Sequence, residues 1–258
     1  MAQQETYYYG QGKVKLAVIA ADGSLGPWRW LMDVSALSAA IQEESVSHRE
    51  SYSGKKAKVR EFGISADMTL SATLRSLDTE NLALFTQGTA TSTAAGTVTG
   101  EVLPSGLVAG DVVNLAQINV SDLVITDSAA SPATLAAEHY SLEALYGSVE
   151  ILSLPTAPAP TQPLKAAYSH GASKQVTFLT AAKRPNVALR YEGVNLAEGG
   201  APVVMELYKL APGLLQELAM ITEGTEVAGL PVTFAALLDT SKPANGPLGQ
   251  FGRIVQAV

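Results

Sequence analysis

Polar and apolar residues alternate without interruption between Glu61 and Arg75. Successive side chains of a β-strand point to opposite faces of the sheet, so the pattern predicts a strand with one buried and one hydrated face. The apolar set comprises Phe62, Ile64, Ala66, Met68, Leu70, Ala72 and Leu74. At about 3.3 Å per residue this strand would be about 45 Å long, well beyond the usual five or six residues.

A second long strand is predicted just before this stretch, over residues 28–42. Its apolar positions share one parity over 28–34 and take the opposite parity over 37–41. A change of phase by one residue is typical of a β-bulge or of a bend between two sheets. Because the polar segment 47–61 joins the two strands, the sequence predicts a long antiparallel hairpin with a protruding loop.

One short helix is predicted over about residues 78–87. Asp78 suits the N-cap position, Gly88 suits the residue that follows the C-cap, and Leu82, Leu84 and Phe85 supply an apolar side. The small-residue segment 89–97 comes next and is predicted to be a linker.

Short strand-like runs bounded by turn residues dominate the rest of the chain, which predicts a mainly-β fold of the sandwich or barrel type. The proline-rich segment 154–164 cannot be an interior strand or helix, and it is predicted to cross the fold in an extended form. The tail 241–254 is predicted to be irregular. We expect a single domain over 1–258, and the sequence leaves open whether 89–164 is a small β subdomain or insertion. Further strands are predicted at 14–19, 98–103, 111–115, 122–126, 139–143, 148–152, 175–179, 186–196, 203–210 and 232–238.

The chain is acidic and has no cysteine. Its formal charge is −7 and its pI is about 5.0, which argues against a protein that grips nucleic acid electrostatically. The lack of cysteine removes disulfides and thiolate sites and fits a reducing compartment. The N-terminal residues have neither a basic region nor an apolar core, and no apolar run is long enough to span a membrane. We therefore expect a protein made in a cytoplasm and used without a membrane.

No catalytic, cofactor or metal site is predicted, so we do not expect an enzyme. His48, His139 and His170 lie far apart, and no nucleophile elbow, zinc-protease or phosphate-loop motif occurs. The tyrosines at 7–9 have no basic surface beside them, so a subunit contact is favoured over base stacking.

Positive charge gathers at the predicted hairpin loop. Segment 47–61 holds five basic and two acidic residues, a charge of +3 on an otherwise acidic chain. A basic tip of this kind could be no more than a solvated loop, but it also suits docking on an acidic surface of another copy. Such a contact is heterologous, and heterologous contacts build rings or filaments. The basic residues are Arg49, Lys55, Lys56, Lys58 and Arg60.

Several phrases resemble one protein family. They are YYYGQGKVKLAVI, WRWLMDVSALSAAI, the alternating strand and then LDTENLALFTQG, followed by VLPSGLVAGDVVNL and the segment 122–152. Together they are similar to the major tail tube proteins of long-tailed, non-contractile bacteriophages. The resemblance covers most of 8–152, is weaker beyond 164, and includes no catalytic motif.

This resemblance implies a β-sandwich with a flanking helix and a structural role in the virion. Six copies would form a ring, long strands of each copy would join into a β-barrel around a channel, and stacked rings would make the tail tube. DNA would pass through without specific binding. The implied partners are other copies of the chain and the tail tip or initiator, tape measure and tail terminator proteins. By position, 47–61 matches the loop that contacts the next ring.

The polar parity of the long strands would then face the channel. A negative bore would repel DNA phosphates and keep the passing DNA from sticking. Arg75 is an exception on this parity. The candidate bore residues are Asp33, Ser35, Ser65, Asp67, Thr69, Ser71 and Thr73.

Other roles stay open at this point. A tube subunit of a contractile tail or secretion apparatus, or a virion decoration protein, would share most of these features. A carbohydrate-binding sandwich would need exposed aromatic residues. Trp28 and Trp30 share a strand parity with Met32, and this favours the core for both rings.

Overall fold

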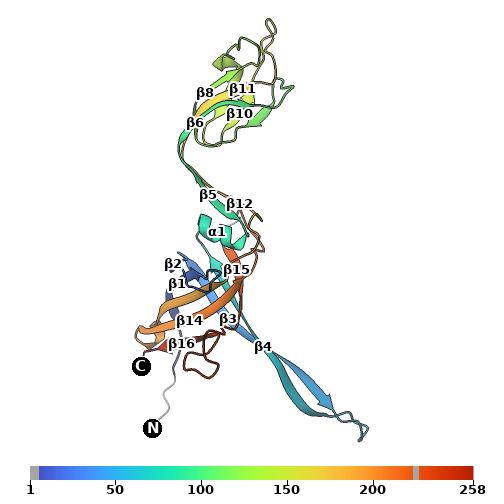
Figure 1. The fold of residues 1–258 in the computed structure, drawn as a ribbon, viewed down its shortest axis with the longest axis vertical. Helices are drawn as coiled ribbons and strands as arrows, with labels where there is room; N and C mark the ends of the chain where they lie inside the picture. The colour runs from blue at the N-terminus through green and yellow to red at the C-terminus, as the bar shows by residue number, and fades with distance from the viewer. Residues whose placement is uncertain (1–5, 223–226, 258) are drawn as a thin grey trace. The chain divides into compact units, whose positions relative to one another are not determined.

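A computed structural model of the chain describes residues 6–222 and 227–257, and it is mainly β. The described residues form sixteen strands in antiparallel sheets and one α-helix, α1 (Thr79–Phe85), as Figure 1 shows. The predictions of a mainly-β fold, one short helix and a long hairpin are confirmed. The chain divides into two compact units, unit 1 (residues up to Ala90 and from Val176 onward) and unit 2 (Thr91–Gln175). The sequence left open a small β subdomain over 89–164. The second compact unit of the structure instead covers Thr91–Gln175.

Unit 1 contains one large antiparallel sheet with the order β2-β1-β13-β14-β15-β4-β3, and β16 pairs with β14 beside β15. The chain passes into and out of unit 2 through a two-stranded sheet of β5 (Thr89–Thr93) and β12 (Ser173–Thr177). The strands of the large sheet are β1 (Gly10–Val18), β2 (Arg29–Trp30), β3 (Val34–Arg49), β4 (Lys58–Leu74), β13 (Val187–Asn195), β14 (Ala201–Pro212), β15 (Leu230–Ala236) and β16 (Gly252–Gln256).

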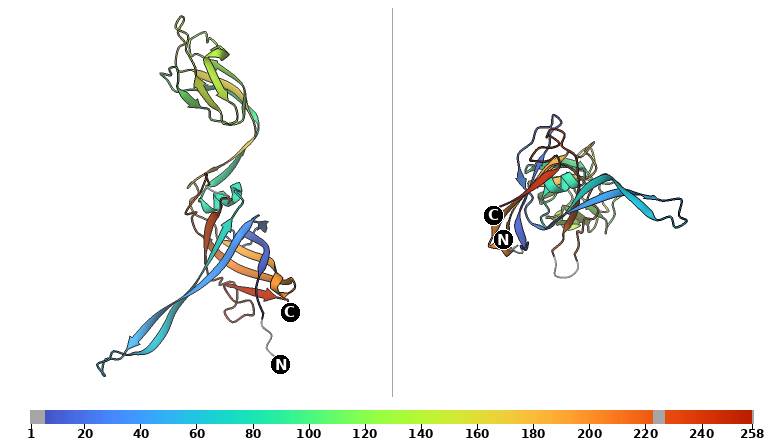
Figure 2. Two further views of the ribbon diagram at one scale, coloured as in Figure 1. Left: turned by 180° about the vertical axis from the view of Figure 1, so that it is seen from behind. Right: turned by 90° about the horizontal axis from the view of Figure 1, so that it is seen from below.

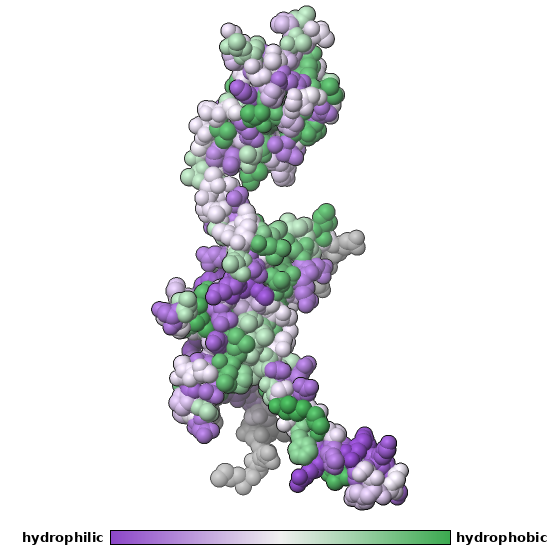
Figure 3. All heavy atoms as spheres, turned by 45° about the vertical axis from the view of Figure 1, so that its right-hand side comes forward, coloured by the Kyte–Doolittle hydropathy of each residue, from purple (hydrophilic) through white to green (hydrophobic). Residues whose placement is uncertain are grey.

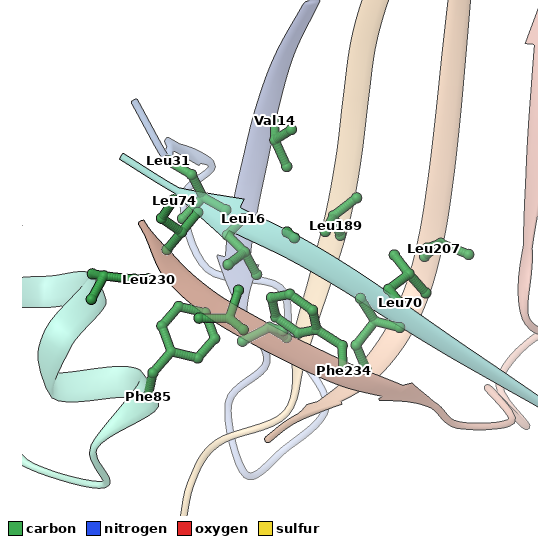
Figure 4. Packing of buried hydrophobic residues seen from close by; sticks show 14 residues of the cluster. Val14, Leu16, Leu31, Leu70, Leu74, Phe85, Leu189, Leu207, Leu230 and Phe234 are labelled. Atoms are coloured by element: carbon green, nitrogen blue, oxygen red, sulfur yellow. The ribbon is translucent and has the colours of Figure 1, made fainter. Parts of the chain in front are cut away.

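The core of unit 1 lies between the sheet and α1. It takes alternate residues from each strand, because only one face of a strand can point inward. The Phe85 ring of α1 meets the Phe234 ring of β15 edge to face, with centroids 5.5 Å apart (Figure 4). Leu16, Leu70, Leu74, Leu189 and Leu210 are fully buried around this pair.

Unit 2 has its own core. Two three-stranded sheets, β6-β11-β8 and β7-β10-β9, enclose a buried cluster that includes Ile125, Val149 and Ile151. The carboxylate of Asp127 accepts hydrogen bonds from the amides of Ala133 and Thr161, which lower its pKa and hold two loops together. The elements are β6 (Gly96–Val102), β7 (Val112–Asn114), β8 (Val120–Thr126), a 3-10 turn at Ala137–His139, β9 (Tyr140–Glu143), β10 (Ser148–Ile151) and β11 (Lys165–His170).

The predicted strand 28–42 is wrong at its start. Met32 has a φ of 63°, far from the extended backbone of a regular strand, and it separates the two-residue β2 from β3. Trp28 and Trp30 are 41% and 46% exposed, not buried as predicted, whereas Leu31 is buried. The inward parity here belongs to Arg29, whose guanidinium bonds to Asn81 and lies 3.7 Å from Glu80 at the start of α1. Leu31 in the core and Arg29 against the start of α1 therefore share the side of this segment that turns inward.

Four other boundaries also differ from prediction. The segment 47–61 is strand at both ends, because β3 runs to Arg49 and β4 begins at Lys58, and residues 50–57 form the loop between them. The predicted linker 89–97 contains β5 and the start of β6, and the tail contains β16. In α1, Asp78 is the N-cap without a side-chain bond, and Gln87, one residue before the predicted Gly88, has the positive φ.

Candidate functional site: the β3–β4 arm

The long hairpin extends beyond the rest of the sheet. β3 and β4 pair from Val34 opposite Leu74 out to Arg49 opposite Lys58, but β15 accompanies β4 only from Leu74 to Thr69. The residues from Ile41 to Met68 therefore form a two-stranded ribbon, here called the arm, which projects from unit 1 (Figures 1 and 2). Among the described residues β3 has no strand on its other edge. A ribbon of two strands is marginally stable in water and leaves an edge open to pairing.

One side of the hairpin is polar along its length, and we call these residues the polar row. Ser65, Asp67, Thr69 and Ser71 are exposed, and Thr73 is half-buried. On β3, Glu44, Gln42, Ala40 and Ser38 lie opposite the first four of them. Gln42 and Glu44 were not among the predicted bore residues, although the change of phase after Ala36 places the even-numbered residues of β3 on the polar side.

Asp33 and Ser35 stand apart from the polar row. The register of β3 and β4 shifts between Val34 and Ala36, so the predicted bulge is present; Ser35 lies at the bulge and Asp33 precedes it. Ser35 Oγ accepts a hydrogen bond of 3.2 Å from Arg75 Nε, and the Arg75 amide donates to the carbonyl of Asp33. Arg75 also donates to the carbonyl of Val227. Arg75 therefore lies at the base of the hairpin, outside the polar row, and this explains why one basic residue occurs on the polar parity of β4.

The apolar parity of β4, here called the apolar row, is covered only at the base of the hairpin. Leu70, Ala72 and Leu74 are buried in the core of unit 1. On the arm the same parity continues uncovered, with Phe62 49% and Ile64 59% exposed. In Figure 3 hydrophobic side chains lie along the arm and hydrophilic ones gather at its end. A surface of this kind is typical of a contact with another protein.

The tip of the arm is ordered by one buried carboxylate. Glu50 is 6% exposed, and its oxygens accept hydrogen bonds from the Tyr52 and Ser53 amides at 3.0 and 2.8 Å, from the Ser53 hydroxyl and from the Ala57 amide. These hydrogen bonds lower the pKa of Glu50 to about 2, and the bond from the Ser53 hydroxyl has the largest effect. From sequence Glu50 is recognisable only as a charge, because a carboxylate that organises a loop has no signature in sequence.

Charge is segregated along the hairpin. The stretches 34–45 and 64–74 contain Glu43, Glu44 and Asp67 and no basic residue. The five predicted basic residues all lie farther out, with Lys55 and Lys56 in the tip loop and the other three on the strands. Lys58 pairs with Glu61 at 2.7 Å, and Arg49 donates to the carbonyl of Lys56. The inner part of the arm is acidic and its outer end is basic.

A cleft of about 650 Å³ lies between the base of β3 and the facing strands β1, β13, β14 and β16. Tyr191 is half-buried within it. Its burial, and to a lesser extent its hydrogen bond with the Tyr8 hydroxyl, raise the pKa of Tyr191 to about 12. Asp33 is the one charged residue among its described lining residues. The apolar lining includes Val14, Leu37, Val203, Met205 and Ile254.

The tyrosines and histidines add no chemical centre. Tyr7, Tyr8 and Tyr9 are 57–66% exposed, and Tyr9 donates to Asn195 of β13 at 2.9 Å. His139 bonds to Ser153 at 2.7 Å in unit 2, while His48 and His170 lie on separate strands. Within the described ranges no group of three or more His, Asp or Glu residues could hold a metal ion.

No helix among residues 6–222 and 227–257 is long and apolar enough to cross a membrane.

Residues 7–255 match the family described as "Protein of unknown function UCP028589", and the chain belongs to that family. No curated protein matches the chain.

Proposed function

We propose that this member of the UCP028589 family is a structural virion protein that assembles into stacked rings, forming a phage tail tube through which DNA passes. The resemblance to tail tube proteins suggests six copies per ring. In this role the protein has no catalytic activity, and its partners are its own copies and the proteins that start, measure and end the tail.

The observation that carries the proposal is the arm. Its apolar row has Phe62 and Ile64 uncovered, and the outer edge of β3 carries a row of backbone groups with no partner strand among the described residues. Both features are costly in an isolated chain. The open edge disappears when copies join edge to edge in a closed barrel, and the apolar row is covered when it packs on another copy.

The polar row supports a channel for DNA. In the proposed ring it faces the bore, where Asp67 and Glu44 of every copy would present negative charge and the serines and threonines would hold water. A negative wall repels phosphates over a Debye length of about 8 Å at physiological salt, so DNA passes without adhering.

The charge gradient along the hairpin supports stacking. The ordered tip presents Lys55 and Lys56, which are exposed and make no ion pair with the described residues. In a stack the tip of one ring would meet acidic residues such as Glu43 of the next ring. Oppositely charged surfaces of this kind set the register of an assembly and speed its formation.

Negative-stain electron microscopy of the concentrated protein, with and without tail initiator components, tests the proposal. We expect rings or tubes with a central hole. A protein that stays monomeric at high concentration even with the initiator would contradict it.

Asp67→Lys tests the assignment of the bore. The side chain is exposed, so the monomer should fold normally, while DNA passage or phage infectivity should fall at least tenfold because the bore gains positive charge. The matched control is Glu150→Lys, an equal charge change at an exposed site of unit 2. Equal infectivity of the two variants would count against the assignment.

A further inference from the structure

One wall of the cleft in unit 1 continues the core. Its apolar residues Val14, Val203 and Met205 belong to the inward parity of their strands, which is the same parity that builds the buried cluster deeper in unit 1. Ile254 of β16 adds a side chain that is 65% exposed. Because protein interiors are close-packed, the apolar wall of a cleft of this size is a place for side chains from elsewhere.

The arm carries apolar side chains of the kind that the cleft lacks. Phe62 and Ile64 lie on the apolar row, which continues the row that fills the core of unit 1 through Leu70 and Leu74. The arm of the same chain cannot supply them to its own cleft. One wall of the cleft is the base of β3, and β3 and β4 stay paired from that base to the tip, so the arm points away from its own cleft.

Charges at the two surfaces are complementary. Asp33 is the one charged group among the described residues that line the cleft, and it makes no ion pair with any of the residues described. Arg60 lies 5.9 Å from the Phe62 ring centroid and likewise has no carboxylate partner among them. A Phe62 side chain that enters the cleft would bring Arg60 toward Asp33.

We propose that the arm of one copy fills the cleft of the next copy, with Phe62 and Ile64 against Met205 and Ile254 and with Arg60 paired to Asp33. The proposal rests on the assembly proposed above and identifies the surface that receives the arm. Each copy offers one arm and one different cleft, so the contact is heterologous and repeats around a ring. It also gives Asp33 a role in the subunit contact in place of the bore.

The natural absence of cysteine permits a direct cross-linking test. An Ile64→Cys protein is mixed with a tagged Ile254→Cys protein, assembled, and treated with a short bismaleimide. We expect a cross-linked pair that contains one copy of each variant. The control mixture pairs Asp67→Cys, on the opposite face of β4, with Ile254→Cys, and it should give at least tenfold less product. Assembly without the 64–254 product would overturn the arm-in-cleft contact and leave the tube proposal standing. Failure of the natural protein to assemble at high concentration even with tail initiator components would overturn both.

A charge exchange tests the ion pair by assembly. Arg60→Asp and Asp33→Arg should each raise the protein concentration needed for assembly about tenfold, since each places like charges together. The double variant should restore assembly to within about threefold of the natural protein. Lys165→Asp, an equal charge change at an exposed site of unit 2, is the control and should have no effect. Single variants that assemble normally, or a double variant that is worse than either single one, would overturn the pairing.

Discussion

Replacing Phe62 by Ser separates the role of the arm in assembly from its role in the fold. The side chain is 49% exposed and its ring contacts Arg60 on the same arm. A phenylalanine side chain presents on the order of 200 Å², so about 100 Å² remains available for burial by another copy. At about 25 cal/mol per Å², covering this area contributes about 2.5 kcal/mol for each contact. This energy corresponds to a roughly 60-fold change in the association constant.

We therefore expect Phe62→Ser to raise the concentration needed for assembly roughly 60-fold, as measured by sedimentation velocity and electron microscopy. The free energy of unfolding of the monomer, measured in urea, should change by no more than about 0.5 kcal/mol, as for most exposed sites. The matched control is Phe178→Ser, which removes a ring that is 55% exposed and lies outside the arm. Unimpaired assembly of Phe62→Ser, or equal loss in the control, would refute the reasoning.

Three further predictions concern the tip and the core. Reversing Lys55, Lys56 and Lys58 to Glu should leave the fold intact and block ring stacking, so that electron microscopy shows single rings; normal tubes would show that the loop is only solvated. The pKa of Glu50 is lowered to about 2 from an ordinary 4.5, so the order of the tip should be complete above about pH 4.5 and be lost as the pH falls toward 2. Amide chemical shifts of the tip loop report this loss, and Glu50→Gln should show the disordered spectrum at neutral pH. Phe85→Ala should lower the free energy of unfolding by about 3–5 kcal/mol in urea, because the ring is 1% exposed; a change below about 1 kcal/mol would contradict the packing described.

Much of the fold follows from local pattern. The alternation in β4, the hairpin of β9 and β10 and the helix α1 were all predictable, because each has a clear period and its own turn or cap residues. The strands β5, β11 and β16 were missed. All three are short, β11 and β16 follow proline- and glycine-rich segments, and strands distant in sequence pair with each of them.

The candidate site likewise has features that the local sequence predicts and features that it does not. Its basic residues and most of the polar row could be identified from sequence, since charge and parity are local properties. The cleft could not, because its walls come from β1, β3, β13, β14 and β16. The exposure of Trp28 and Trp30 was also hidden, since the side of this segment that turns inward packs through Leu31 on the core and through Arg29 on Asn81, 52 positions later.

For the alternating strand itself, the sequence determined which side chains share a face. A two-residue period is a property of extended backbone and needs no neighbour. Only the tertiary structure decided where that apolar face is covered. β15 ends its pairing at Thr69, so Leu70 and Leu74 are buried, whereas Phe62 and Ile64 remain on the open arm. Burial depends on which distant segments lie across a strand, and the pattern of the strand alone contains no information about them.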